Sequence, residues 1–584
     1  MTQPPAIRPS FRARLAGAGT WLRANPLHAT LLLLAAVLFA LHFLHLNADF
    51  PNNSPWSDWS KYTDEGWYGD AAIRHYLSGN WYWKGDFNPA VALPVWPALE
   101  LALFRFTGVS AVAARALTLG VFAVTLVALY RLIARHTHAR TEHSALPLAA
   151  PLTVLLLCAS PFLYVFERMA ILEPLLIALT LLALLTASHL HAFVFRRHPE
   201  PQAKDPRIFY AAMKLKTILP TIALALLLPA MVLTKTTAIC LFPAVFYMVW
   251  ARAGYRLRPA LRLAVPPALV GLALWLAYFF LLVRPHYLED YRYLFSANAY
   301  TGIALEPLYS VVLNTLGDGV WMGKTLYLSL YAALALLLFW RPRLLTNPLI
   351  PALLLWIGGY FAFLAYHNNL QPRYYLVVAV PITAFVALAI DGLRRPATNP
   401  GAPGPSHLGT WVRLSYSIIA TLVVLAIVVP DAIEQLHFIL HPTYDFRNAA
   451  EQIAALVRAD KTHSNLILSI SGSDITLMTG LPSIDDDFGT MELPDRVRAY
   501  RPGWYVAWND VEDDKTEALA PLYDLVRVAA FPAMDDPDRN LLILYRLDPA
   551  EAPAKPATHP PKQRTPKPLV TKLGQQPSTN QLQH

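Results

Sequence analysis

Long apolar runs follow one another along most of the chain, separated by short polar segments. Most are close to the roughly 20 residues that cross the hydrocarbon core of a bilayer as a helix. The pattern predicts an α-helical multipass membrane protein with about eleven spans. The predicted spans cover residues 27–46, 110–133, 146–165, 169–195, 218–233, 236–251, 263–283, 325–340, 349–366, 374–390 and 414–429.

One further apolar run, 93–106, is about 14 residues long and contains Pro94, Pro97, Glu100 and Arg105. This length and content favour a helix that lies at the membrane surface or re-enters it. With the N-terminus in the cytoplasm, omitting this run as a span places most Lys and Arg of the connecting loops on the cytoplasmic side, as the positive-inside rule requires.

The pattern changes after the last apolar run. A helix is predicted over 448–457 and short strands over 465–470, 504–508, 525–531 and 541–547, which together indicate a small α/β domain. The predicted organisation is a cytoplasmic N-terminus (1–26), a transmembrane domain (27–431) with a first outer loop (47–109), an extracytoplasmic α/β domain (432–548) and a disordered tail (549–584).

Composition agrees with this assignment. Of 584 residues, 55% are hydrophobic and 15% are charged, whereas soluble domains are typically about 25% charged. A secreted soluble enzyme and a nucleic-acid-binding protein are therefore excluded, and the net charge of +9 is explained by the cytoplasmic loops. The two cysteines, Cys158 and Cys240, lie inside apolar runs and form no disulfide or metal-binding pattern.

Candidate chemistry begins in the first outer loop, where Asp64 and Glu65 are followed by Trp67 and Tyr68. Adjacent carboxylates beside aromatic rings could supply a general base over a pocket at the membrane surface. A hydrated loop with an aromatic interface belt is the alternative explanation.

Three other charged positions lie at the ends of apolar runs on the same predicted side. Glu173 precedes a proline at the outer end of a run, and Lys235 and Arg373 each lie between two runs. A lysine offers a point charge and an arginine a bidentate fork, and both suit a phosphate. Structural ion pairs and snorkelling to lipid headgroups remain alternatives for each residue taken alone.

The ordered set of motifs resembles the GT-C glycosyltransferases. Within that class it is similar to the protein-mannosyltransferase-like branch, which includes the aminoarabinose and galacturonic acid transferases of lipopolysaccharide. The matching segments are Asp64 to Tyr68, Arg168 to Pro174, Leu233 to Lys235 and Pro372 to Tyr375. Two positions depart from the usual pattern, because Glu173 stands where the family more often has Asp and Thr236 where Gly is common.

The resemblance implies an enzyme of the bacterial inner membrane. It would move a sugar from a polyprenyl-phosphate carrier to a lipid, glycan or protein acceptor at the outer face, with inversion. Its catalytic residues would be Asp64, Glu65 and Glu173. The donor phosphate would be held by Lys235, Arg373, Arg168 and Tyr374. Candidates for the substrate pocket are Trp67, Tyr68, His367 and Tyr291.

No cofactor is certain, although some GT-C enzymes need a divalent metal. Asp64 and Glu173 are oxygen ligands of the kind that bind Mg²⁺ or Mn²⁺. Two other functions remain open: a membrane transporter or lipid flippase, and a glycan ligase that uses a polyprenyl diphosphate. A transporter is typically built from inverted repeats, and the chain shows no convincing repeat.

Overall fold

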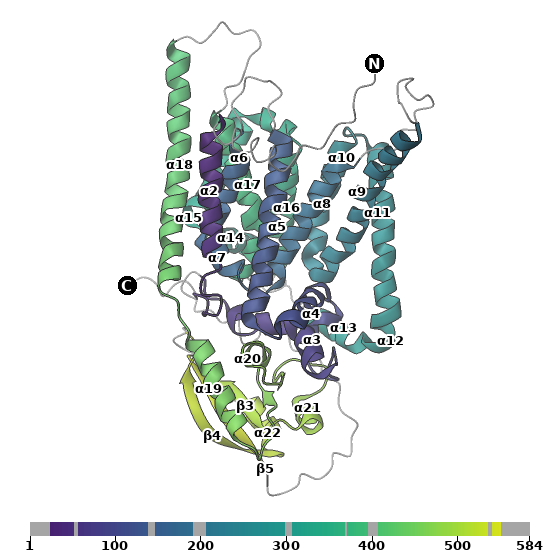
Figure 1. Cartoon of the computed structure of the whole chain (residues 1–584), viewed down its shortest axis with the longest axis vertical. Coiled ribbons are helices and arrows are strands. Elements are labelled where there is room, and N and C mark those ends of the chain that lie inside the picture. The colour runs from purple at the N-terminus through teal and green to yellow at the C-terminus, as the bar shows by residue number, and fades with distance from the viewer. Residues whose placement is uncertain are drawn as a thin grey trace.

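A bundle of long apolar helices makes up most of the molecule, and a small sheet domain lies against one end of it (Figure 1). The computed structural model describes residues 24–51, 56–137, 147–190, 206–297, 307–367, 371–394, 407–534 and 540–550. Most of the predicted N-terminal segment and nearly all of the predicted tail lie outside these ranges. The end of the bundle that meets the sheet domain is called the domain end below.

Apart from α14, which lies in a segment for which no span was predicted, the helices of the bundle correspond to the apolar runs of the sequence. Their bounds are α2 (Pro26–Leu41), α5 (Ala111–Thr137), α6 (Ala149–Ala159), α7 (Pro161–Phe166), α8 (Leu172–His189), α9 (Pro206–Thr234), α10 (Phe242–Arg252), α11 (Leu257–Tyr278), α14 (Leu308–Gly317), α15 (Lys324–Ala335), α16 (Leu349–His367), α17 (Leu376–Arg394) and α18 (His407–Leu440).

Six helical segments of the described chain are long and apolar enough to cross a membrane. They are 111–137, 172–189, 257–286, 349–367, 372–393 and 417–440. A seventh candidate is the pair Leu308–Met322 and Lys324–Trp340, which is bent by 119°, and four shorter apolar helices lie alongside. The chain is therefore an integral multipass membrane protein, while the count of about eleven crossings stays a prediction.

One predicted span is broken. The run 146–165 forms two helices, α6 and α7, because Pro161 has no N–H to continue the helical hydrogen bonds. Ser160 caps the second helix by accepting a hydrogen bond from the N–H of Leu163.

Burial distinguishes the centre of the bundle from its rim. In the most apolar stretch of the segment 372–393, 89% is buried inside the protein. In the corresponding stretches of 257–286 and 417–440, only 11% is buried. The helix α17 is thus the core of the bundle, and α11 and α18 turn apolar side chains outward, as expected of helices that face lipid.

Two short helices lie across the domain end (Figure 1). They are α3 (Asp64–Ser78) and α4 (Val95–Thr107), which pack against each other. Because α4 has 13 residues, it is too short to span a bilayer, and it lies beside α3 at the end of the bundle. Two further short helices, α12 (Arg284–His286) and α13 (Leu288–Ala297), lie at the same end.

The terminal domain is a five-stranded sheet in the order β2-β1-β3-β5-β4. Its strands are β1 (Ile467–Leu468), β2 (Ser483–Ile484), β3 (Trp504–Trp508), β4 (Tyr523–Pro532) and β5 (Leu541–Pro549). Its helices are α19 (Asp445–Ala459), α20 (Gly472–Thr479), α21 (Leu493–Tyr500) and α22 (Asp513–Leu519). The strands β1 and β2 pair in parallel, and β5 runs antiparallel to β3 and β4, so the predicted α/β class is correct. The strand β2 was not predicted, because its two residues lie between Pro482 and three aspartates rather than in an apolar run.

The terminal domain docks on α3 through α20. The backbone N–H of Gly66 donates to Oδ1 of Asp474 at 2.5 Å, and the indole N–H of Trp67 donates to the carbonyl of Ile470 at 3.1 Å. A Cβ atom at position 66 would lie 2.2 Å from the carbonyl carbon of Ser473. A glycine is therefore required where the two helices touch.

Replacing this glycine tests the docking. Gly66→Ala should lower the free energy of unfolding by about 1–3 kcal/mol, because the backbone of α20 must shift to admit the new methyl group. Gly120→Ala is the matched control, since nothing lies within 4 Å of its Cβ position and alanine favours a helix. Thermal unfolding of both variants in detergent provides the comparison. Equal melting temperatures would contradict the close approach.

Candidate active site

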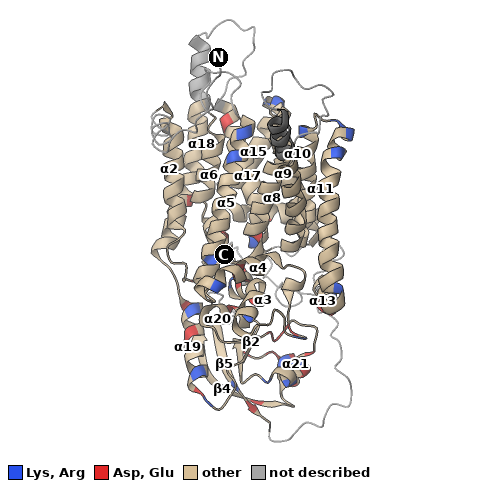
Figure 2. Ribbon diagram, turned by 45° about the vertical axis from the view of Figure 1, so that its right-hand side comes forward, with Lys and Arg blue, Asp and Glu red and all other residues tan. Residues whose placement is uncertain are grey.

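Charged residues of both signs gather where the bundle meets the terminal domain, while the middle of the bundle holds few (Figure 2). Four of them are Asp64, Glu173, Lys235 and Arg373, which come from four separate segments of the chain. All four are buried, with at most 9% of their surface exposed. Their direct contacts form two ion pairs that share one aromatic ring.

Asp64 is the first residue of α3. The hydroxyl of Thr63 donates to its Oδ1 at 3.0 Å, and its Oδ2 lies 3.2 Å from Nη2 of Arg373. Burial raises the pKa of Asp64 to about 6, although the attraction of Arg373 acts in the opposite direction. The carboxylate is thus ionised at neutral pH and is a stronger base than an exposed aspartate.

Arg373 lies in a short 3₁₀ turn, η9 (Pro372–Tyr375), that leads into α17. Its Nη1 donates to Oδ1 of Asp58 at 2.5 Å, and its backbone N–H donates to Oδ2 of the same residue at 3.1 Å. Asp58 therefore fixes the guanidinium at two points. Asp58 was not predicted as a site residue, because it belongs to no recognised motif and pairs with a residue 315 positions away.

Glu173 and Lys235 form the second ion pair. Glu173 lies in the first turn of α8, and Lys235 lies in the break between α9 and the 3₁₀ helix η3 (Thr236–Leu241). The Nζ of Lys235 is 4.4 Å from the centre of the Tyr374 ring, and the guanidinium of Arg373 is 4.7 Å from it. Two cations thus lie against one tyrosine.

Two of the predicted pocket residues adjoin this cluster. Tyr68 is close enough to Asp64 and Glu173 for both carboxylates, after burial, to raise the pKa of its hydroxyl. His367 stacks on Tyr374 with the ring centres 6.4 Å apart. Both side chains therefore border the pair of cations.

Glu65 is held differently from its neighbour. Nε and Nη2 of Arg115 donate to its two oxygens at 2.9 and 2.5 Å, and the backbone N–H of Ala170 donates to Oε1 at 2.9 Å. Arg115 also donates to the carbonyls of Leu46 and Ala48. These contacts favour an anchoring role for Glu65, which ties α3 to α5 and to the turn before α8.

Three further predicted residues lie away from the cluster of cations. Trp67 packs edge-on against Phe87 and Phe488 beneath the terminal domain, and Tyr291 packs against Phe279 and Phe295 at the edge of the same hydrophobic cluster. Arg168 was predicted to bind the donor phosphate, but it donates to the carbonyls of Leu44 and His45 and lines a different pocket.

The terminal domain adds a carboxyl group that the sequence did not single out. Asp474 is 1% exposed, accepts the N–H of Gly66, and lies near Asp64 and Glu65. Burial and the charge of Glu65 raise its pKa well above the ordinary value. Only the fold could reveal this contact, because α20 belongs to another domain.

The predicted Mg²⁺ or Mn²⁺ site does not fit the observed contacts. Asp64 faces Arg373 and Glu173 faces Lys235, so each carboxylate is already balanced by a cation. Within the described part of the chain, no three His, Cys, Asp or Glu side chains group as metal ligands.

No protein-family model matches the sequence, and no curated protein matches it. The structure is similar to that of ArnT from Cupriavidus metallidurans bound to undecaprenyl phosphate, with a TM-score of 0.55, 15% identity, and coverage of 88% of this chain and 97% of that one. It is also similar to the archaeal oligosaccharyltransferase AglB from Archaeoglobus fulgidus, solved with an inhibitory peptide and a dolichol-phosphate. That match has a TM-score of 0.51, 13% identity, and coverage of 91% of this chain and 77% of that one. The chain therefore has the GT-C fold, as its motifs implied.

Stability measurements can separate the two adjacent carboxylates. Glu65→Gln should lower the free energy of unfolding by about 3 kcal/mol, because it leaves Arg115 buried without a counter-charge. Asp64→Asn should change it far less, because Arg373 keeps Asp58 and because burial disfavours the charge of Asp64. Thermal unfolding of both variants in the same detergent tests this difference. The assignment fails if the two variants lose equal stability.

Proposed function

We propose that the protein is a membrane glycosyltransferase that moves a sugar from a polyprenyl-phosphate carrier to a hydroxyl or amine of an acceptor. One observation carries the proposal: a buried, ionised carboxylate of raised pKa, Asp64, lies against Arg373, which shares the Tyr374 ring with Lys235. Such an arrangement puts a base and a pair of cations in one place.

In this proposal the donor phosphate binds between Lys235 and Arg373. Both cations are positioned before any ligand arrives, Lys235 by Glu173 and Arg373 by Asp58. Support comes from the two proteins of similar fold, since one was solved with undecaprenyl phosphate and the other with a dolichol-phosphate. Phosphate oxygens would take over part of the ion pairing that the carboxylates supply here.

The transfer step balances as a single displacement. Asp64 takes the proton from the acceptor hydroxyl or amine while that atom attacks the anomeric carbon of the sugar. The bond between this carbon and the carrier's phosphate oxygen breaks, and the polyprenyl monophosphate leaves with an additional negative charge. Lys235 and Arg373 stabilise that charge in a site from which water is largely excluded. Attack opposite the leaving group inverts the anomeric configuration.

The other residues of the cluster position the two cations or border the sugar site. Glu173 and Asp58 hold the two cations, and Tyr68 and His367 border the space that the sugar would enter. The terminal domain covers the start of α3 and so shapes the approach of the acceptor. We place the domain end at the outer face of a bacterial inner membrane, in agreement with the Lys and Arg distribution of the loops.

The proposal predicts a loss of product without a loss of protein. Asp64→Asn should lower the transfer rate by about 10²–10⁴-fold, because the variant keeps the shape of the side chain but removes the base. Asp513→Asn, an exposed aspartate of the terminal domain, is the matched control. Mass spectrometry of glycolipids and glycoproteins from cells producing each protein measures the outcome. Wild-type product levels in Asp64→Asn would show that Asp64 is not catalytic. An unchanged glycan profile after deletion of the wild-type gene would contradict the proposed glycosyltransferase function.

The raised pKa of Asp64 predicts a pH dependence. Below about pH 6 the carboxylate is protonated and cannot accept the acceptor's proton, so the rate should fall about tenfold for each further unit of pH. Above about pH 7 the ionisation of Asp64 is nearly complete, so this group should cause no further change in the rate. Initial rates of the purified enzyme between pH 5 and 8 test this. A profile that is flat across that range would contradict the role of Asp64 as the base.

A further inference from the structure

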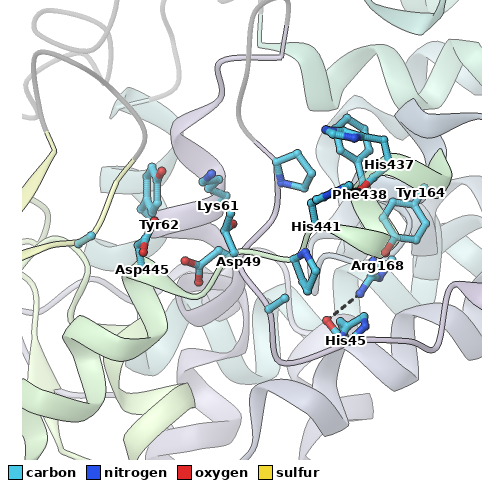
Figure 3. A pocket seen from close by; sticks show the side chains of 15 residues that line it. His45, Asp49, Lys61, Tyr62, Tyr164, Arg168, His437, Phe438, His441 and Asp445 are labelled. Carbon is cyan, nitrogen blue, oxygen red and sulfur yellow. Dashed lines mark hydrogen bonds between the residues drawn. The ribbon is translucent and has the colours of Figure 1, made fainter. Parts of the chain in front are cut away.

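A pocket lies at the domain end, and its lining does not include Lys235 or Arg373. Its volume is about 300 Å³, which is at the lower end of the range for ligand sites. Its walls come from the segment after α2, the 3₁₀ turn η1 (Trp59–Tyr62), the end of α7, the end of α18 and the start of α19 (Figure 3). None of the four candidate active-site residues lines it.

Arg168 is one of two basic residues, with Lys61, that line this pocket. It is 3% exposed, and its Nη2 donates to the carbonyls of Leu44 and His45 at 2.7 and 2.9 Å. Its guanidinium lies 4.2 Å from the centre of the Tyr164 ring, which fixes its plane. Its Nε is buried and has no hydrogen-bond acceptor in the structure. The side chain is thus held in place while its Nε donor stays unused.

Arg168 also lacks the counter-charge that its neighbours have. Buried cations at the domain end pair with carboxylates, as in Arg115 with Glu65 and Lys235 with Glu173. Over the residues that the structure describes, no carboxylate lies within ion-pair distance of Arg168. Burial accordingly lowers the pKa of Arg168 to about 10, so the group stays charged at neutral pH.

The other polar groups favour an anion. Lys61 is buried in the wall, and His45, His437 and His441 surround the same space (Figure 3). The carboxylate of Asp49 is turned to the start of α19, where it accepts the N–H groups of Phe446 and Arg447 at 2.8 and 3.3 Å. The remaining carboxylate of the lining, Asp445, is exposed.

The surface next to the pocket is apolar. Phe43 and Leu44, just after α2, are 45% and 43% exposed, and Leu436 and Leu440 at the end of α18 are 41% and 71% exposed. The two helices meet there through Gln435 and His42, whose side chains are 3.4 Å apart. An amphiphile could therefore place its head in the pocket and its chains along α2 and α18.

We propose that this pocket binds a phosphate group carried by a membrane amphiphile, at a site separate from the donor phosphate. A planar guanidinium with an unused Nε donor can bind a phosphate oxygen, and the exposed leucines can contact the lipid chains. The inference does not depend on the transfer reaction. Two sources share this chemistry: a phosphomonoester lipid, such as an acceptor or a carrier, and the phosphodiester headgroup of a bilayer lipid.

Binding of a short-chain probe tests the proposal. Dioctanoyl phosphatidate is titrated into the full-length protein in neutral detergent and followed by native mass spectrometry. Each titration is repeated with Arg373→Gln added to the same protein. This change is expected to prevent binding at the proposed donor site, so that the remaining binding reports on the pocket of Arg168 alone. Arg168→Gln should weaken binding about tenfold or more, because it removes a charge-assisted hydrogen bond. Arg284→Gln, an exposed arginine at the same end, should leave it unchanged.

A second variant covers the case in which Arg168→Gln fails to fold. His441→Glu puts a carboxylate at the exposed mouth of the pocket and leaves the hydrogen bonds of Arg168 intact, and it should weaken binding to a similar extent. Wild-type affinity in the folded variants would overturn the proposal. Equal binding of dioctanoylglycerol, or equal binding of inorganic phosphate alone, would overturn it as well.

The choice of lipid then identifies the source. Preference for phosphatidate over dioctanoyl phosphatidylglycerol supports the site with a phosphomonoester lipid as its ligand. Equal affinity for the two supports the site with a bilayer headgroup as its ligand. Binding of neither lipid would overturn the proposal.

Discussion

The structure of the domain end depends on the pairing of charges that are removed from water. A buried arginine or lysine is stable only beside a carboxylate or a set of backbone carbonyls, since an isolated charge in apolar surroundings is very costly. Arg373 meets this requirement with Asp58 and Asp64, and Lys235 meets it with Glu173. Each pair joins segments far apart in the sequence. Charge pairing thus joins the first loop to the start of α17, and α8 to the break after α9.

The same requirement gives the two carboxylates of the first loop different roles. Asp64 and Glu65 are adjacent in the sequence, but on a helix adjacent side chains point in different directions. Glu65 meets Arg115 and an N–H group, which fully occupy its oxygens, whereas Asp64 faces a guanidinium whose main partner is Asp58. Asp64 is therefore the carboxylate that can exchange a proton, because Arg373 keeps Asp58 as its main partner when Asp64 is protonated. The sequence contains both residues but not the partners that separate them.

The sequence predicted much of the fold because apolar length and periodicity are local properties. The spanning helices, the short surface helix at 93–106 and the α/β character of the terminal domain all follow from them. Features that depend on distant partners were missed or misplaced. Asp58 and Asp474 can be recognised only once their partners are known. Arg168 was expected beside the donor phosphate, because the predicted topology shows at which end of the bundle a residue lies but not where within that end.

The contact between Gly66 and Asp474 also bears on how the protein is made. It joins residues 408 positions apart, so α3 emerges from the ribosome long before the segment that covers its first turn. Until α20 has been synthesised and folded, the start of α3 and its carboxylates remain uncovered. Assembly of this region is therefore among the last events of biogenesis, and a chain truncated before α20 would insert its helices into the membrane without ever completing the region around Asp64.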